Sequence, residues 1–279
     1  MYPYKTFTVV TDNGPYITKL ILKAPETVRA ECIDKDTFSV YVERIDPKTG
    51  KGFLENHTWP GPKIFPSQGY RPVSAAYPCD ENGGKVYQSG HIALEMPYQM
   101  GAPIGYSMAA SLREGGYNAL VECRYRVTQV KDIPGEVPIN GWIFDESQGD
   151  ICPQLRGWQN GCSHYEPLPL NYGYFTPDLD HAKQSFTALD SNYGDEWEHT
   201  FPEKLPLVIW LHGHGEGGDD PALAYTGNKV VAISSDDIQR KLGGAGYVLA
   251  PQCPTFWMNS GAVNHQDPKE LTSSKSMYT

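Results

Sequence analysis

No apolar run in this sequence approaches the roughly 20 consecutive residues that a membrane-spanning helix requires. The first residues, MYPYKTFTVV, also lack the basic start and the apolar stretch of a secretory signal peptide. These absences predict a chain that is neither inserted into a membrane nor exported through a signal at this end. The cytoplasm is therefore its default location.

Positive charge is also scarce. The 279 residues include 23 Lys and Arg against 33 Asp and Glu, which gives a formal net charge of −10. An acidic surface repels the phosphates of nucleic acids and of anionic lipids. We therefore expect neither nucleic acid nor a membrane surface among the partners.

The cysteines lack the spacing of a metal site. Six of them are scattered along the chain without a CxxC pair. Cys152 and Cys162 bracket a short loop and would be able to form a disulfide in an exported protein. Because no export signal is present, free thiols are the simpler expectation.

Turn-forming residues and tyrosine are abundant, with 28 Gly, 23 Pro and 18 Tyr. Residues 1–130 consist of short segments of alternating polarity between turn residues, and none shows a long period of 3.6. One example is the segment 37–46, whose apolar residues fall mostly on one side: Phe38, Val40, Val42 and Ile45. The pattern is typical of an antiparallel β-sandwich, and no internal repeat suggests a propeller or a solenoid.

The segment KDIPGEVPING, residues 131–141, has the Pro and Gly content of a domain boundary. We therefore predict a first domain over residues 1–130. Residues 131–279 are expected to hold a linker and then a unit of a different class.

From Leu205 onward the pattern is typical of an α/β unit. The run LPLVIWLH predicts a strand buried on both faces of a parallel sheet, and GYVLAPQ predicts a second one. Between them, NKVVAIS is a weaker strand candidate. The segment SSDDIQRKLGG predicts a short helix that Ser235 caps and Gly243 ends.

The segment HGHGEGGDD, residues 212–220, follows the first of these strands, and three kinds of site would fit it. The first is a dinucleotide site, because the segment contains a GxGxxG motif and Asp236 stands further along. However, Asp219 and Asp220 stand where a phosphate-binding helix should begin, and their carboxylates would repel phosphate. We therefore expect no dinucleotide cofactor.

The second kind of site is a zinc site, because His212, His214 and Glu216 alternate at the end of a strand. Metallohydrolases with this arrangement need a further Asp and His directly afterwards. Here Gly217 and Gly218 occupy those positions. A His-x-His metallohydrolase therefore remains an alternative, but no metal is expected.

The third kind of site is an oxyanion hole, which holds the negative oxygen that forms when a nucleophile attacks an ester carbonyl. Its donors would be the backbone N–H groups of Gly213, His214 and Gly215, since glycines leave such groups uncovered. The imidazole of His212 would brace the loop by hydrogen bonding. This is the interpretation that we favour.

The segments HGHGEGG and APQCPTFWM resemble a family of α/β-hydrolase esterases of the prolyl-oligopeptidase and carboxylesterase type, whose members carry an N-terminal immunoglobulin-like domain. The segment RPVSAAYPCDENGGKVYQSGHIALEM is similar to that domain. The resemblance implies an immunoglobulin-like sandwich followed by an α/β-hydrolase unit. It also implies serine-dependent hydrolysis of a small ester by a Ser-Asp-His triad, and self-association through the immunoglobulin-like domain.

The nucleophile that this family requires has no counterpart here. It should stand in a GxSxG frame after the oxyanion strand, and no serine after Gly218 does. Ser107 and Ser163 precede the loop, which is the wrong order, and His265 is too early to be the base. We therefore expect an N-terminal fragment of a longer enzyme, inactive by itself.

Two further residues are candidates for lining a substrate site. Gln252 and Trp257 leave the carboxyl end of a predicted buried strand, where ligands of α/β proteins bind. The rival to an enzyme is a non-catalytic protein whose sandwich binds carbohydrate or another protein chain. Tyr and Trp are frequent enough for sugar stacking, but a binding protein gives no reason for HGHGEGG.

Overall fold

The structure is a computed structural model that describes residues 1–52, 55–57, 63–98, 103–110, 118–164, 170–190, 201–213 and 215–254. It divides into two compact units. The first unit consists of Met1–Val9, Gly14–Ser111 and Leu120–Cys152. The second consists of Val10–Asn13, Leu112–Ala119 and Pro153–Thr279.

The first unit is built on one hydrogen-bonded sheet, in which the described strands follow the order β6-β3-β11-β12-β1-β2-β8-β7. The bounds of these strands are Tyr2–Thr11 (β1), Gly14–Arg29 (β2), Phe38–Ile45 (β3), Gln68–Arg71 (β6), Ala75–Cys79 (β7), Gln88–Glu95 (β8), Glu122–Gln129 (β11) and Ile143–Ile151 (β12). Two further pairs of short strands are β4 (Glu55–His57) with β5 (Lys63–Phe65) and β9 (Met108–Ala110) with β10 (Asn118–Leu120), and β10 begins in the segment Leu112–Ala119, which belongs to the second unit. Short 3₁₀ turns occur at Ala30–Cys32 and Pro103–Gly105.

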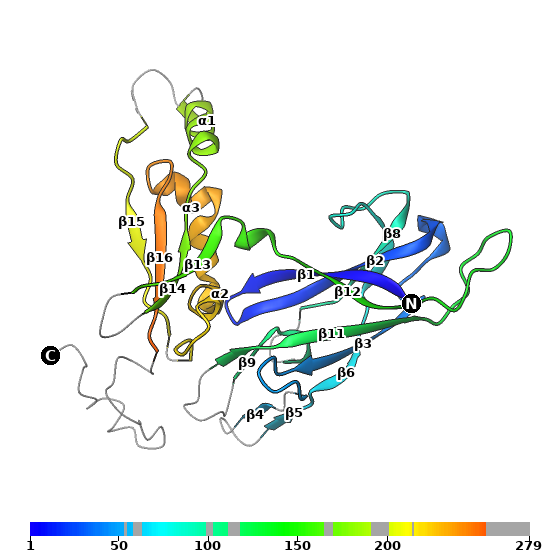
Figure 1. Cartoon of the computed structure of the whole chain (residues 1–279). Coiled ribbons are helices and arrows are strands. Elements are labelled where there is room, and N and C mark those ends of the chain that lie inside the picture. The colour runs from blue at the N-terminus through cyan, green and yellow to red at the C-terminus, as the bar shows by residue number, and fades with distance from the viewer. Residues whose placement is uncertain are drawn as a thin grey trace. The chain divides into compact units, whose positions relative to one another are not determined.

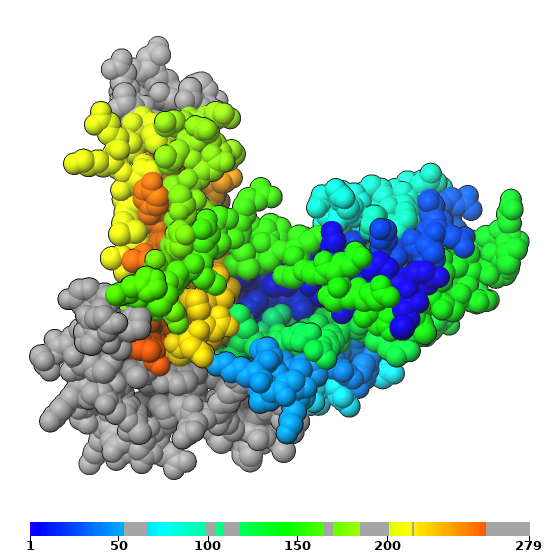
Figure 2. Space-filling view, viewed as in Figure 1, coloured from blue at the N-terminus to red at the C-terminus, as the bar shows by residue number. Residues whose placement is uncertain are grey.

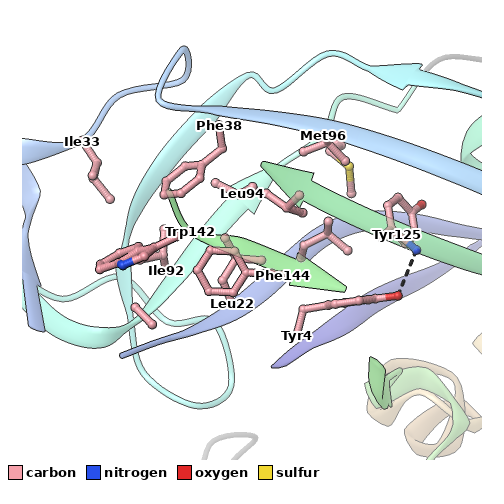
Figure 3. Packing of buried hydrophobic residues seen from close by; sticks show 14 of the residues in the cluster. Tyr4, Leu22, Ile33, Phe38, Ile92, Leu94, Met96, Tyr125, Trp142 and Phe144 are labelled. Atoms are coloured by element: carbon pink, nitrogen blue, oxygen red, sulfur yellow. Dashed lines mark hydrogen bonds between the residues drawn. The ribbon is translucent and has the colours of Figure 1, made fainter. Parts of the chain in front are cut away.

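This sheet curls so that its two halves face each other across one hydrophobic core (Figure 1). Leu22 and Leu94 enter the core from β2 and β8, and Val42 and Val127 enter it from β3 and β11. In Figure 3 the labelled side chains of Leu22, Leu94 and Phe38 lie around Phe144. A single curled sheet thus forms both layers of the predicted sandwich, and the alternation predicted for β3 is confirmed by the burial of its apolar residues.

The strand β12 extends the first unit beyond residue 130, where the sequence analysis placed its end. It pairs with β11 in antiparallel and with β1 in parallel orientation, so the sheet is not entirely antiparallel. Asp150 accepts hydrogen bonds from the hydroxyl groups of Thr6 and Thr8, at 2.5 and 2.7 Å. The segment 131–141 therefore connects two strands of one sheet.

The second unit contains a sheet with the strand order β13-β14-β16-β15. Its strands are β13 (Trp158–Cys162), β14 (Asn171–Phe175), β15 (Leu207–Ile209) and β16 (Tyr247–Gln252), and its helices are α1 (Leu179–Asp190), α2 (Ala222–Thr226) and α3 (Asp236–Lys241). The 3₁₀ segments are η3 (Pro153–Leu155) and η4 (Gly227–Ser234). Tyr225 of α2 stacks on Trp158, with ring centroids 4.7 Å apart, and this contact fixes α2 on the sheet.

The strand β15 is parallel to β16, as predicted, but it is not buried on both faces. It has one neighbour among the described strands, and its side chains at Leu207 and Ile209 are 56% and 57% exposed. In Figure 2 the yellow residues around β15 lie at the surface of this unit. The apolar run LPLVIWLH therefore predicted the strand and its parallel pairing, but not the exposure of Leu207 and Ile209.

The weaker strand candidate NKVVAIS was wrong, because it forms the 3₁₀ segment η4. Val230 and Val231 are buried there, so the apolar pair packs without joining the sheet. The helix predicted just afterwards is confirmed as α3, with Ser235 at its N-cap position. The hydroxyl group of Ser235 donates to the carbonyl group of Ala232 and does not cap the helix.

Two expectations that were based on composition can be compared with the described residues. None of the described helices is long and apolar enough to cross a membrane. Cys152 and Cys162 are not joined by a disulfide.

We predict that residues 1–152, produced alone, unfold cooperatively, whereas residues 1–130 do not. The shorter fragment lacks β12 and with it Trp142 and Phe144, which are 5% and 0% exposed. Truncation of one such side chain typically costs about 3–5 kcal/mol. That is a large part of the roughly 5–15 kcal/mol that stabilises an ordinary domain. Thermal melts followed by far-UV circular dichroism would compare the fragments, and equal cooperative melts would contradict the prediction.

Candidate functional site

The glycine-rich loop begins where β15 leaves the sheet. The N–H group of Trp210, just after β15, donates to the carbonyl group of Leu249 in β16. The loop then lies beside the end of β16, since the N–H group of Gly218 donates to the carbonyl group of Cys253 at 2.8 Å. Because β15 and β16 are parallel, the loop lies at the carboxyl ends of both strands.

His212 is 3% exposed and joins the loop to the residue that follows β16. Its Nε2 atom accepts a hydrogen bond from the N–H group of Cys253 at 2.9 Å. Nε2 therefore carries no proton, and Nδ1 carries one and donates it to the carbonyl group of Gly213 at 2.7 Å. Both ring nitrogens are thus engaged with the backbone, and zinc would have to displace one of these bonds to bind.

Gln252 is 1% exposed and holds the second half of the same loop. Its Nε2 atom donates to the carbonyl groups of Glu216 and Asp220, at 2.9 and 2.7 Å. Its Oε1 atom is buried without a hydrogen-bond partner. The amide group that was expected to line a substrate site therefore supports the loop from β16.

Glu216 lies inside the loop, with its side chain only 7% exposed. Its Oε1 atom accepts a hydrogen bond from the Nδ2 atom of Asn118 at 3.3 Å, and its Oε2 atom is buried without a partner. The backbone N–H group of Asn118 also donates to the carbonyl group of Gly215 at 2.7 Å. Asn118 therefore contacts two successive residues of the loop.

Three glycines make room for these side chains. A Cβ atom on Gly213 would lie 2.6 Å from the Oε2 atom of Glu216, and one on Gly227 would lie 2.8 Å from its Cγ atom. A Cβ atom on Gly215 would lie 2.5 Å from the Nδ2 atom of Asn118. Any other residue at these positions would have to displace a buried polar group.

Burial raises the pKa of the Glu216 carboxyl group above its ordinary value. The charge interaction with His212 and hydrogen bonds from the backbone of Gly213 and the side chain of Asn118 oppose this rise only in part. An ionised carboxylate would hold its negative charge away from water, which is costly in a buried environment. The neutral acid is the form that this environment favours.

The remaining candidate residues lie away from the described contacts of the loop or outside the described residues. His214 and Trp257 lie outside the described residues, as does His265. Ser163 follows β13, where its hydroxyl oxygen accepts a hydrogen bond from the N–H group of Leu170, and Ser107 directly precedes β9. Neither serine stands on a turn from a strand to a helix.

The elements after the loop differ from those of a dinucleotide site. The helix that follows it, α2, has five residues, and the segment expected to form the next strand is the 3₁₀ segment η4. A dinucleotide site needs a strand, a phosphate-binding helix and a second strand in this order. In addition, the carboxylate group of Asp220 accepts a hydrogen bond from the N–H group of Ala222 at the start of α2, where a phosphate would bind.

Sequence reasoning missed two contributors to this site. Asn118 lies 98 residues before Glu216 in the sequence, and nothing in its neighbourhood marks it. Cys253 takes part through its backbone alone, which no side-chain motif can signal. Glu216 belongs to the HGHGEGG motif, but the sequence suggested only a metal ligand at this position and not a buried carboxyl group that supports the loop.

Two comparisons found similarity to proteins or domains that are described as esterases. Residues 3–137 match the family model described as the esterase Ig-like N-terminal domain. Among solved structures, the fold is similar to that of a chain described as a thermostable esterase, with a TM-score of 0.62 and 17% identity. The similarity covers 90% of this chain and 58% of that one, so this chain spans well under two thirds of the esterase chain. The search of curated proteins found no match. At this identity the structural likeness shows a shared fold, and the family match supports an Ig-like domain of the esterase kind.

We predict that Glu216→Gln changes the pH dependence of stability. In the folded state, burial raises the pKa of Glu216 above its ordinary value of 4.5. Its stabilising contribution is therefore complete below that value and is lost as the pH rises through the folded-state pKa. The variant should match the parent near pH 4 and exceed its stability at neutral pH, by up to about 1–3 kcal/mol, the usual cost of an unsatisfied buried group.

Thermal unfolding of both proteins across this pH range would measure the difference. Glu203→Gln is the matched control, because Glu203 is an exposed glutamate of the same unit. If the profiles of the parent and of Glu216→Gln stay parallel, the carboxyl group does not titrate as described.

Proposed function

We propose that this chain supplies the oxyanion-binding loop of a serine-dependent esterase with an α/β-hydrolase fold, which acts on a small carboxylic ester. One observation carries the proposal: the described residues of a glycine-rich loop are hydrogen-bonded at the carboxyl ends of two parallel strands. The N–H group of Cys253 binds the imidazole of His212, and the side-chain amide of Gln252 binds the carbonyl group of Glu216. The match of residues 3–137 to an esterase domain and the shared fold support ester hydrolysis as the reaction.

Attack on an ester carbonyl group places negative charge on its oxygen. In the proposed mechanism, backbone N–H groups of Gly213, His214 and Gly215 donate hydrogen bonds to that oxygen. Donors that are already in place stabilise the charge without any cost of reorganisation at the moment of reaction. The role of His212 is to hold these peptide groups in position, because both of its ring nitrogens bind the backbone.

The proposal assigns the loop, and not the nucleophile, to these 279 residues. No serine after Gly218 stands in a GxSxG frame. Ser107 and Ser163 precede the loop in the chain and lack the strand-to-helix turn that exposes a catalytic hydroxyl group. Residues 1–279 are therefore proposed to be inactive alone. Trp257 remains a candidate for contact with the substrate, and self-association through the first unit remains a prediction.

A fluorophosphonate probe and a short-chain p-nitrophenyl ester would test the reaction class. We expect the protein expressed from the complete gene to be labelled and to hydrolyse the ester. Residues 1–279, produced separately, should do neither, because no serine in them has the required context. Stoichiometric labelling of Ser107 or Ser163 with turnover would refute the placement of the nucleophile, and no reaction in either protein would refute the esterase proposal.

A second test distinguishes backbone from side-chain chemistry at residue 214. In the protein from the complete gene, His214→Ala should keep most of the activity. His214→Pro, which removes the N–H group, should lower kcat by roughly 10²–10³. Loss of activity in His214→Ala and with EDTA, together with stoichiometric bound zinc, would instead establish a metal site.

A further inference from the structure

A row of exposed side chains crosses three strands of the first unit. Tyr70 of β6 pairs with Tyr41 of β3, and Tyr41 pairs on its other side with Arg126 of β11. In the next row, Ser39 of β3 pairs with Thr128 of β11. These residues and Val130 line an open hollow of about 440 Å³ on the outer face of the sheet.

Strand alternation explains why these side chains gather on this face. Along β3, Val40 and Val42 enter the core, so Ser39 and Tyr41 point to the other side. The same alternation in β11 directs Arg126 and Thr128 outward. All of the described lining residues except Val130 therefore lie on strands of the curled sheet.

The aromatic part of the hollow is exposed to solvent. Tyr70 is 73% exposed, and its ring makes an edge contact with Tyr41, with centroids 5.1 Å apart. Val130, at the far side, is 58% exposed. An exposed ring that is held by a second ring presents an electron-rich face on which polarised C–H groups of a ligand can stack.

The polar part of the hollow offers unused hydrogen-bonding groups. Within the part of the chain that the structure describes, no group forms an ion pair or a hydrogen bond with the guanidinium group of Arg126. Its neighbour Arg124, in contrast, binds both carboxylate oxygens of Glu122, at 2.8 and 3.0 Å. The hydroxyl groups of Ser39 and Thr128 lie on the same face as Arg126.

From this combination we infer that the outer face of β6, β3 and β11 binds a neutral oligosaccharide, with a sugar ring stacked on Tyr70 and hydroxyl groups bound by Arg126, Ser39 and Thr128. A sugar ring has an apolar C–H face and a polar rim, which matches an exposed aromatic ring beside hydroxyl and guanidinium groups. The volume falls within the range of about 300–1,000 Å³ that is typical of small-molecule sites.

A neutral ligand fits this face better than an anionic one, because the surrounding charges are mixed. Glu43 pairs with Gln68 and Arg124 in the adjacent row, so acidic and basic groups alternate around the rings. A phosphate or a uronate would meet the repulsion of Glu43 as well as the attraction of Arg126. Hydroxyl groups, which both donate and accept hydrogen bonds, can use both kinds of side chain.

Calorimetric titration of residues 1–279 with cellotriose, maltotriose and xylotriose would test this inference. We expect saturable binding of at least one of them, with an affinity that changes little between 50 mM and 500 mM salt. Tyr70→Ala should weaken this binding about tenfold, and Arg126→Gln should weaken it as well. Tyr87→Ala is the matched control, because Tyr87 is 64% exposed in the same unit but does not line the hollow.

Far-UV circular dichroism would show whether each variant keeps its fold. The absence of binding to all three trisaccharides would overturn the inference. Binding that Tyr70→Ala leaves intact, or that falls steeply with salt, would also overturn it. If sedimentation shows a dimer of the parent chain that Tyr70→Ala dissociates, the face is an interface between copies and not a sugar site.

Discussion

The geometry of the glycine-rich loop depends on one hydrogen bond, from the N–H group of Cys253 to the Nε2 atom of His212. It fixes the proton on Nδ1, and Nδ1–H in turn holds the carbonyl group of Gly213. The carbonyl group of Cys253 also accepts a hydrogen bond from the N–H group of Gly218, so the backbone of one residue binds the loop at both of its ends. Because Cys253 directly follows β16, the sheet dictates the shape of the loop.

The buried carboxyl group of Glu216 explains the composition of the loop better than backbone freedom does. Of the loop glycines that the structure describes, Gly218 has a positive φ, at 117°. Gly213 and Gly215 are needed for a different reason, because side chains pack directly against their Cα atoms. The glycines of the HGHGEGG motif were predicted to expose backbone N–H groups. Gly213 and Gly215 also leave the space that the side chains of Glu216 and Asn118 occupy.

The sequence predicted most of the first unit because alternation of polar and apolar residues is a local property. It failed for β12, whose segment IFDESQGDI is largely polar and exposed outside its first residues, so no period of two is visible. It also failed for NKVVAIS, because a short apolar run does not distinguish a strand from a tightly wound turn that buries the same two valines. In the loop, the motif identified the residues involved but not Asn118, whose contact with Glu216 depends on the tertiary fold.

The central position of β1 has a consequence for how the chain is made. Thr6 and Asp150, which are joined by a hydrogen bond across the β1–β12 pair, are separated by 144 residues in the sequence. During synthesis, β1 and β2 are available early, but the partner on the other side of β1 emerges only after most of the first unit has been translated. Bringing the two ends of such a long stretch of chain together costs conformational entropy before the stabilising contacts can form. Sheets with many pairings between residues distant in sequence therefore fold slowly. Until β12 arrives, the edge of β1 is unpaired and open to association with other chains.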